Sequence, residues 1–256
     1  MPSQKISFKN SSGEDLVAWL ESPDNEKPLA YAIFAHCFTC SKDYKAVFHI
    51  SRILRSEGIA VLRFDFTGLG ESSGDFSDTN FASNIHDLLD AAKFLEDSFE
   101  SPKLLIGHSL GGAAVLQVAD LLPFVKAVVT IAAPADLNHL RDKLMIRAGS
   151  DDGDGGGVEV TISGRKFKLE RHFFESLEQS SMTKVIRKLD KALLVIHSLS
   201  DEIVSVNNGE QIFENAKYPK SFLGLINTDH LLSNEEDAKY VGSVIAAWVK
   251  GFLSAG

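Results

Sequence analysis

Residues 104–112 have the sequence Leu104-Leu105-Ile106-Gly107-His108-Ser109-Leu110-Gly111-Gly112, an apolar, strand-like run that turns through a serine into a helical pattern. The segment satisfies G-x-S-x-G, in which small residues at 107 and 111 avoid collisions around a serine held in strained backbone geometry. Such a turn exposes the Ser109 hydroxyl above a sheet, and free N–H groups at the helix start point toward any oxyanion formed there. The run therefore predicts a nucleophilic serine. The alternative is a serine that merely caps a helix.

A serine hydroxyl is a good nucleophile only when a base accepts its proton, and an imidazole does this best when an acid orients its other nitrogen. His230 follows the last predicted strand, and Asp201 follows the strand before it. Both are expected on loops at the carboxyl edge of a sheet, and the chain order Ser109, Asp201, His230 is the one expected for this turn. Glu202 and Asp229 stay open as alternative acids, because each is adjacent to the preferred residue of its loop.

The loop after an early strand is expected to give a second donor to the oxyanion. We predict that the backbone N–H groups of Phe38 and Leu110 form the oxyanion hole, and that His36 braces the loop by hydrogen bonding. Cys37 and Cys40 form C-x-x-C, which elsewhere indicates a redox pair or half of a zinc site. The chain contains 2 cysteines, so a second pair for zinc is missing, and a redox role stays open.

Short β-rich runs alternate with longer helical patterns, which is typical of a mostly parallel sheet with helices on both faces. We expect Asp43 to cap the first helix and Gly58 to end it. Strands are predicted at residues 16–21, 29–35, 59–64, 103–107, 125–132, 193–197 and 221–226. Helices are predicted after position 43, at 84–99, from about 110, around 209–216 and at about 235–253.

The alternation stops between Pro134 and Asp190, which predicts an insertion. It contains an acidic, glycine-rich turn from Asp151 to Gly157, followed by a predicted β-hairpin with strands at 158–162 and 167–169. Residues 1–133 and 191–256 are then expected to form one core, and 134–190 a small cap. Several apolar residues of the insertion could line an acyl pocket or pack the cap onto the core: Leu144, Met145, Ile146, Phe173, Phe174 and Leu177.

Glycines after the strand at 59–64 invite a nucleotide-binding interpretation, which the spacing excludes. Gly68 and Gly70 fit the first two positions of G-x-G-x-x-G, but Ser73 occupies the third and a loop follows. The sequence also lacks a P-loop lysine, H-E-x-x-H and a complete calcium loop. We therefore predict neither a cofactor nor a metal.

Composition narrows the possible partners. The 256 residues include 26 Lys and Arg and 35 Asp and Glu, a formal net charge of −9 without a basic block. This acidic field argues against nucleic acid and anionic membrane surfaces as partners, and favours a small neutral substrate. Apolar segments fall far short of the roughly 18 residues that cross a bilayer, and a secretory signal is not expected. With few cysteines, a cytoplasmic location is expected, while the oligomeric state stays open.

These residues together resemble the α/β-hydrolase superfamily. The likeness rests on R-x-D-x-x-G-x-G-x-S at Arg63 to Ser72, G-H-S-L-G-G at 107–112, the Asp201 loop and the Asp229-His230 pair. The chain is more closely similar to the hydrolase half of bacterial proteins in which this domain is fused to an OsmC-like peroxidase domain. The shared stretches are His-Cys-Phe-Thr-Cys-Ser-Lys-Asp at 36–43, Leu-Arg-Phe-Asp-Phe-Thr-Gly-Leu-Gly at 62–70 and Asp-His-Leu-Leu at 229–232.

The resemblance implies an α/β-hydrolase fold with an eight-stranded, mostly parallel sheet, no cofactor, and a small cap before the penultimate strand. It does not identify the substrate, because this fold hosts many activities. We expect a carboxylesterase-like serine hydrolase that cleaves small or medium acyl esters through a Ser-His-Asp triad and an acyl-enzyme. Alternatives are a thioesterase or aminopeptidase with the same triad, a non-catalytic ligand-binding module, and a redox partner acting through Cys37 and Cys40.

Overall fold

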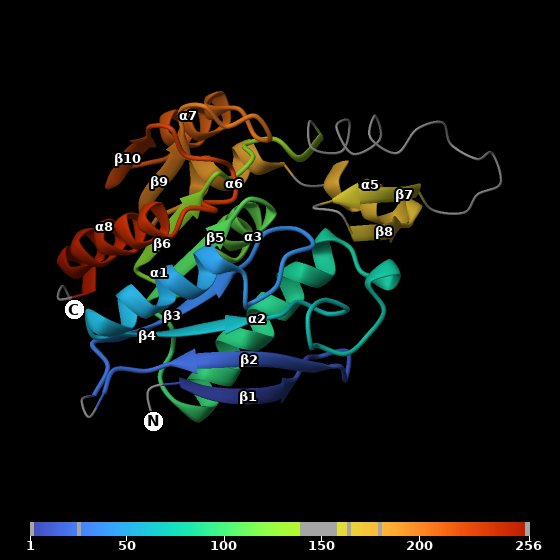
Figure 1. Ribbon diagram of the computed structural model, residues 1–256, viewed down its shortest axis with the longest axis horizontal. Coiled ribbons are helices and arrows are strands. Elements are labelled where there is room, and N and C mark those ends of the chain that lie inside the picture. Colours follow the sequence, from blue (N-terminus) through green and yellow to red (C-terminus); the bar gives the residue numbers. More distant parts are fainter. Residues whose placement is uncertain (1–2, 25–26, 139–157, 163–164, 179–180, 254–256) are drawn as a thin grey trace.

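The computed structural model describes residues 3–24, 27–138, 158–162, 165–178 and 181–253 (Figure 1). Its main sheet has eight strands in the order β1-β2-β4-β3-β5-β6-β9-β10. Their bounds are β1 Ser3–Lys9, β2 Asp15–Glu21, β3 Ala30–Ala35, β4 Ile59–Phe64, β5 Leu104–His108, β6 Ala127–Ile131, β9 Ala192–Ser198 and β10 Lys220–Leu225. Six neighbouring strands of this sheet run parallel to one another: β4, β3, β5, β6, β9 and β10. Strand β2 is antiparallel to both β1 and β4. The predicted mostly parallel, eight-stranded sheet is confirmed.

Helices cover both faces of the sheet. One face carries α1 Lys45–Ser56 and α8 Glu235–Leu253, which pack against each other (Figure 1). The other carries α2 Phe81–Ser98, α3 Leu110–Ala119, α6 Met182–Lys188 and α7 Val206–Asn215. Along β3, Phe34 joins the core under α1 and α8, whereas Ile33 joins the core on the opposite face. Consecutive strand residues point to opposite faces, so a strand buried on both must be continuously apolar.

The starts of helices α1 and α2 and the presence of strand β1 differ from the sequence-based expectation. The N-cap residue of α1 is Tyr44, whose side chain makes no capping hydrogen bond, so the prediction that Asp43 caps this helix is wrong. Asp43 instead accepts hydrogen bonds from cationic side chains, which outweigh the cap. Helix α2 begins at Phe81, earlier than predicted, because Asn80 and Ser83 form a capping box. Strand β1 was not predicted as a separate element.

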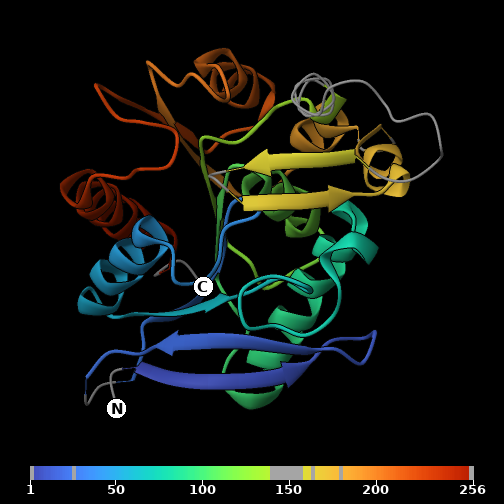
Figure 2. The ribbon, with the colours of Figure 1, turned by 45° about the vertical axis from the view of Figure 1, so that its right-hand side comes forward.

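The described residues between β6 and β9 include a β-hairpin, as predicted. Strands β7 Val158–Ile162 and β8 Arg165–Leu169 pair in an antiparallel sheet of their own, which Figure 2 shows apart from the main sheet. Helix α5 Arg171–Glu178 follows and lies against α2, while β8 lies against the short helix η1 Phe76–Asp78. The turn from Asp151 to Gly157 and residues Leu144, Met145 and Ile146 lie outside the described residues.

Three apolar residues of α5 are part of the core rather than free to line a pocket. Phe173, Phe174 and Leu177 are buried and belong to the hydrophobic cluster that includes α2 and α3. Their role in the structure is therefore to pack this segment onto the body of the protein. None of the described helices combines the length and the apolar character that a membrane crossing requires.

Candidate active site

Ser109 lies in the tight turn between β5 and α3, and β5 is a central strand of the main sheet. Its backbone has φ 55° and ψ −122°, a positive φ that is uncommon for residues other than glycine. The Ser109 N–H donates to the carbonyl oxygen of Ile131 at 2.8 Å, which ties the turn to the end of the neighbouring strand β6. The half-buried Ser109 therefore sits at the carboxyl edge of the parallel strands.

The glycines beside Ser109 are required by close backbone contacts. A Cβ atom on Gly107 would lie 2.2 Å from the carbonyl oxygen of Gly111. A Cβ atom on Gly111 would lie 2.4 Å from the carbonyl oxygen of Ala35 and 2.5 Å from that of His36. All three distances are far below van der Waals contact, so the predicted need for small residues at these positions is confirmed.

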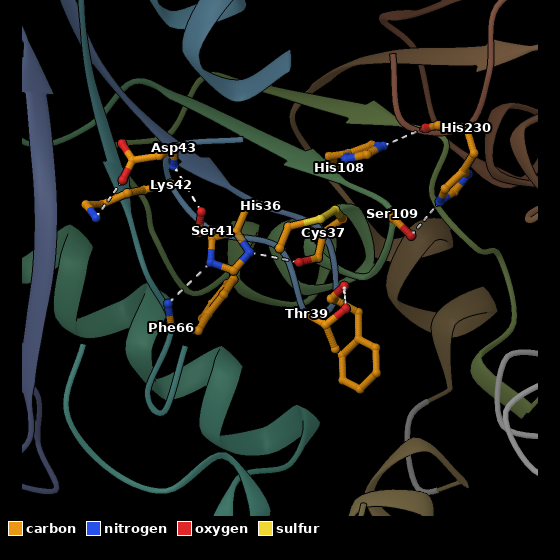
Figure 3. Close-up of a disulfide and its surroundings, with 12 residues drawn as sticks. His36, Cys37, Thr39, Ser41, Lys42, Asp43, Phe66, His108, Ser109 and His230 are labelled. Carbon is orange, nitrogen blue, oxygen red and sulfur yellow. Dashed lines mark hydrogen bonds and ion pairs between the residues drawn. A yellow bond between two sulfur atoms is a disulfide. The ribbon is translucent and has the colours of Figure 1, made fainter. Parts of the chain in front are cut away.

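The structure brings the side chains of Ser109, His230 and Asp201 into one hydrogen-bonded line. The Nδ1–H group of His230 donates to Oδ2 of Asp201 at 2.8 Å. The other ring nitrogen, Nε2, then accepts the hydroxyl proton of Ser109, with Nε2 and Oγ 3.0 Å apart (Figure 3). The Asp201 side chain is fully buried and the His230 side chain is 7% exposed, so water competes little with these bonds.

Asp201 is held in place by its own loop. Its Oδ1 atom accepts hydrogen bonds from the backbone N–H groups of Ile203 and Val204, each at 2.8 Å. Burial alone would raise the pKa of the Asp201 carboxyl. The hydrogen bond from His230, the charge of that ring and the two N–H donors nevertheless hold the pKa below its usual value. Asp201 is therefore ionised at neutral pH, which suits an acid that orients an imidazole.

The two alternative acids lie elsewhere. Glu202 and Asp229 are both exposed. Asp229 accepts a hydrogen bond from the Ser233 N–H at 2.9 Å, so it stabilises its own turn. Among the hydrogen bonds and ion pairs found for the described residues, none joins Glu202 or Asp229 to His230. Of the three candidates, the structure brings only Asp201 to the histidine within this part of the chain.

The two predicted oxyanion donors border one small cavity. Phe38 and Leu110 both line a space of about 10 Å³, room for roughly one water molecule. The two residues meet there because β3 and β5 are parallel neighbours whose carboxyl ends share an edge. In the described part of the chain, the backbone N–H groups of Phe38 and Leu110 have no protein acceptor. Free N–H groups at this edge are suited to bind an oxyanion.

His36 braces the Phe38 loop, as the sequence predicts. Its Nδ1–H group donates to the carbonyl oxygen of Cys37 at 2.8 Å. Its Nε2 atom accepts from the Phe66 N–H at 3.4 Å, which connects the loop to the end of β4. Burial lowers the pKa of the His36 ring, so the ring stays neutral with one donor and one acceptor nitrogen.

Cys37 and Cys40 are joined by a disulfide (Figure 3). Bonded sulfurs are not free thiolates, so this pair is not half of a zinc site. Among the described residues, we find no group of three or more His, Cys, Asp or Glu side chains that could hold a metal ion. Thr39, between the cysteines, has φ 64°, which is a genuine outlier for a β-branched residue.

Sequence reasoning missed a buried ion-pair cluster behind this loop. The Lys42 ammonium is fully buried and lies 2.8 Å from Asp65, 2.5 Å from Glu71 and 3.0 Å from Asp43. Burial alone would lower the pKa of Lys42, but hydrogen bonds to Asp65, Glu71 and Asp43 raise it above its usual value. The backbone N–H of Lys42 also donates to Oδ1 of Asp65 at 2.6 Å, so the cluster fixes this loop to the end of β4.

Sequence reasoning also left His108 without a role. The Nε2–H group of His108 donates to the backbone carbonyl oxygen of His230 at 2.8 Å, which joins the serine turn to the histidine loop. Burial and the neighbouring charge of His230 lower the pKa of His108 to about 3, although the hydrogen bond to the His230 carbonyl opposes this shift. His108 is therefore neutral at neutral pH.

Removal of the buried ammonium should destabilise the fold. Lys42→Met leaves the buried Asp65 carboxylate without its cation, and breaking a buried ion pair from one side costs about 3–5 kcal/mol. Lys5→Met is the matched control, because Lys5 binds the same Glu71 at 2.6 Å but is half exposed. The control should lose about 1 kcal/mol or less in urea unfolding. Equal losses in the two variants would contradict this account.

The depressed pKa of His108 predicts part of the acid sensitivity. The unfolded chain protonates this ring below about pH 6.5, whereas the folded protein does so only near pH 3. Its contribution to stability is thus fully present above about pH 6.5 and is lost as the pH falls toward 3. His108→Gln keeps an N–H donor that does not titrate. Between about pH 7.5 and 4.5, wild type should lose about 2–3 kcal/mol more unfolding free energy than this variant. Parallel urea curves for both proteins would exclude the role.

The sequence matches a known family model and several known proteins. A model of the alpha/beta hydrolase family matches residues 32–241. The mitochondrial palmitoyl-protein thioesterase ABHD10 of Mus musculus is 35% identical over 177 residues, which are 66% of this chain and 58% of the mouse protein. The Rattus norvegicus protein of the same name is 32% identical over 105 residues, or 41% and 34% of the two chains. This chain thus aligns with less than two thirds of the length of these curated relatives.

Two solved structures have the same architecture over nearly their whole length. The esterase domain of a Rhodothermus marinus protein is 45% identical, with a TM-score of 0.82 and coverage of 99% of this chain and 100% of that one. Est1E from Butyrivibrio proteoclasticus, solved with ferulic acid, has a TM-score of 0.85 at 19% identity, covering 97% and 99%. The second likeness shows the fold alone. Because the family match spans most of the chain, this protein belongs to the alpha/beta hydrolase family.

Proposed function

We propose that this protein is a serine esterase that cleaves small or medium acyl esters through Ser109, His230 and Asp201. The observation that carries the proposal is the line of hydrogen bonds from the Ser109 hydroxyl to His230 at 3.0 Å and from His230 to Asp201 at 2.8 Å. A proton can pass along the first of these bonds without rearrangement. The 45% identity to an esterase domain supports the same assignment.

The geometry suits acyl transfer in two half-reactions. His230 Nε2 takes the Ser109 proton as Oγ attacks the acyl carbon, and Asp201 stabilises the imidazolium that forms. The imidazolium then gives its proton to the leaving oxygen, which releases the alcohol and leaves an acyl-enzyme. In the second half-reaction, His230 deprotonates a water molecule that attacks the acyl carbon. The bond between the acyl carbon and Ser109 Oγ then breaks, the imidazolium gives its proton to Oγ, and the carboxylic acid leaves.

The backbone N–H groups of Phe38 and Leu110 are proposed to stabilise the oxyanion of both tetrahedral intermediates. Leu110 is the first residue of α3, so its N–H also benefits from the positive end of the helix dipole. Both donors belong to fixed backbone and need little reorganisation during the reaction. Loss of one such donor typically costs about 10² to 10³ in rate.

An open hollow borders His230. Its volume is about 520 Å³, within the range of roughly 300–1,000 Å³ that is typical for small-ligand pockets. Apolar Ile203 and Leu231 line it together with polar Ser200 and Glu202. We propose that this hollow holds part of a small or medium ester next to the reacting carbonyl.

A second candidate function is thioester hydrolysis. It is favoured by the curated relatives, which are named as palmitoyl-protein thioesterases. The same Ser109, His230 and Asp201 would serve, since only the leaving atom changes from oxygen to sulfur. The aminopeptidase and ligand-binding alternatives lack a comparable observation.

A cap role for 134–190, a cytoplasmic location and a closer relation to the OsmC-fused hydrolases remain predictions.

The proposed nucleophile is tested by covalent labelling and turnover. A fluorophosphonate probe should label Ser109, and Ser109→Ala should lower kcat on a chromogenic short-chain ester by about 10⁴-fold or more. Peptide mass spectrometry identifies the labelled residue, and circular dichroism checks that the variant is folded. Full ester hydrolysis by folded Ser109→Ala would refute the assignment.

The choice of acid is tested with three matched variants. Asp201→Asn should lower kcat by about 10⁴-fold, because the amide cannot hold the correct histidine tautomer. Glu202→Gln and Asp229→Asn remove the neighbouring carboxylates by the same kind of change. Because neither carboxylate bonds to His230, both variants should keep kcat within about threefold of wild type, and an effect of Glu202 on substrate binding is expected in KM alone. A large loss in either control, with activity retained by Asp201→Asn, would reassign the acid.

Substrate class is tested by paired acyl series. Nitrophenyl esters and the corresponding thioesters of increasing chain length should give the highest kcat/KM for short or medium chains, below about twelve carbons. A higher kcat/KM for each thioester than for its matched ester would favour the second candidate. An optimum at palmitoyl length would contradict the proposed size of the acyl group.

A further inference from the structure

The Cys37–Cys40 disulfide closes a very small ring in the loop that carries the proposed oxyanion donor. The ring encloses only Phe38 and Thr39, and the two cysteine Cα atoms lie 5.3 Å apart. Closing so short a loop excludes fewer conformations of the unfolded chain than closing a long one, so in the chain-entropy account the bond adds less to global stability than a long-range disulfide would. Its effect is concentrated on the two residues inside the ring.

The ring orients the peptide group that carries the Phe38 N–H. The carbonyl oxygen of Cys37 accepts hydrogen bonds from His36 Nδ1–H at 2.8 Å and from the Cys40 N–H at 3.0 Å. In a planar trans peptide the C=O and the following N–H point in opposite directions. Holding the Cys37 carbonyl from one side therefore aims the Phe38 N–H to the other side, where it has no acceptor among the described residues.

Of the two groups that hold this carbonyl, one depends on the disulfide. His36 is fixed by its burial and by Phe66, independently of the cysteines. Cys40 is held against Cys37 across Thr39, whose φ of 64° is unfavourable for a β-branched residue. Without the covalent bond, Thr39 is free to return to a negative φ, and the Cys40 N–H then leaves the Cys37 carbonyl.

We propose that Cys37–Cys40 is a reversible redox site that controls ester hydrolysis by setting the direction of the Phe38 N–H, with a dithiol as its reductant. The oxidised form is the active one. The proposal rests on the proposed function, because it acts through the oxyanion hole of that reaction. It also fits the expected reducing location, where disulfides are usually transient, catalytic or redox-sensing.

The structure indicates which sulfur a reductant reaches. Cys37 is 3% exposed, whereas Cys40 is half-buried and lines an open hollow of about 440 Å³ with Thr39, Ser41 and Tyr44. A thiolate of the dithiol attacks Cys40 Sγ, forms a mixed disulfide and releases Cys37 as a thiolate. The second thiol of the reductant then attacks the reductant sulfur that is bonded to Cys40, which releases Cys40 as a thiolate. Two electrons and two protons pass to the protein, and the reductant leaves as a disulfide.

The first test compares turnover by the oxidised and reduced protein. Wild type is reduced with dithiothreitol, desalted under nitrogen and assayed with a chromogenic short-chain ester. We expect kcat to fall about tenfold, less than for complete loss of one donor, with KM changed by less than about twofold. Reoxidation should restore kcat. Because the chain contains 2 cysteines, iodoacetamide mass shifts report the state of this pair alone.

The double variant Cys37→Ala/Cys40→Ala is the matched control. It should have the kcat of reduced wild type and should not respond to dithiothreitol, while circular dichroism and urea unfolding show a native fold. The proposal is overturned if this variant keeps the kcat of the oxidised protein, or if wild type shows the same kcat in both redox states.

Fluorophosphonate labelling of Ser109 separates the two proposals. Slower labelling of the reduced protein supports the redox site, and equal labelling rates in both states overturn it while the proposed function stands. If Ser109 is labelled in neither state and both states lack hydrolysis, the proposed function fails and the redox proposal fails with it.

Discussion

The site depends on a backbone approach that leaves no room for a side chain. Gly111 lies so close to the end of β3 that an added Cβ atom would be 2.4 Å from the Ala35 carbonyl oxygen. This contact presses the start of α3 against the strand that leads into the Phe38 loop. It therefore brings together Ser109 and the two proposed oxyanion donors, although they come from segments about seventy residues apart in the sequence. A larger residue at position 111 would move Ser109 and the proposed donors apart, although it would leave each of the reacting groups chemically unchanged.

Backbone strain is concentrated where the proposed chemistry occurs. Among the described residues, five other than glycine have a positive φ: Thr39, Ser109, Ala132, Asn227 and Leu232. All five lie in loops that follow the carboxyl ends of parallel strands of the sheet. Such conformations cost about 1–3 kcal/mol each and persist only when the surroundings determine them. Here the apolar core on both faces of the sheet and the Lys42 cluster hold these residues in their strained conformations.

Local patterns predicted the fold and the three aligned side chains because each signal is contained in a short segment. The strand-serine-helix turn, Asp201 and His230 each follow a recognisable strand, and parallel topology places all three at one edge. Lys42 and His108 were missed because their partners are distant in sequence: Lys42 binds Asp65 and Glu71, and His108 binds the carbonyl of His230. The error at Asp43 has the same origin, since a contact with Arg63 at 2.8 Å outweighs a local helix cap.

Phe38 links the proposed chemistry to helix α5, which lies between β6 and β9 in the chain. Its ring centroid lies 5.0 Å from that of Phe173 in α5 and 5.6 Å from that of Phe76 in η1. Phe173 is fully buried, so this aromatic contact anchors the Phe38 side chain while the Cys37 carbonyl orients its N–H. The same residue thus contacts α5 through its side chain and is proposed to bind the oxyanion through its backbone N–H. Changes in the packing of α5 can therefore reach the proposed reacting centre without touching Ser109.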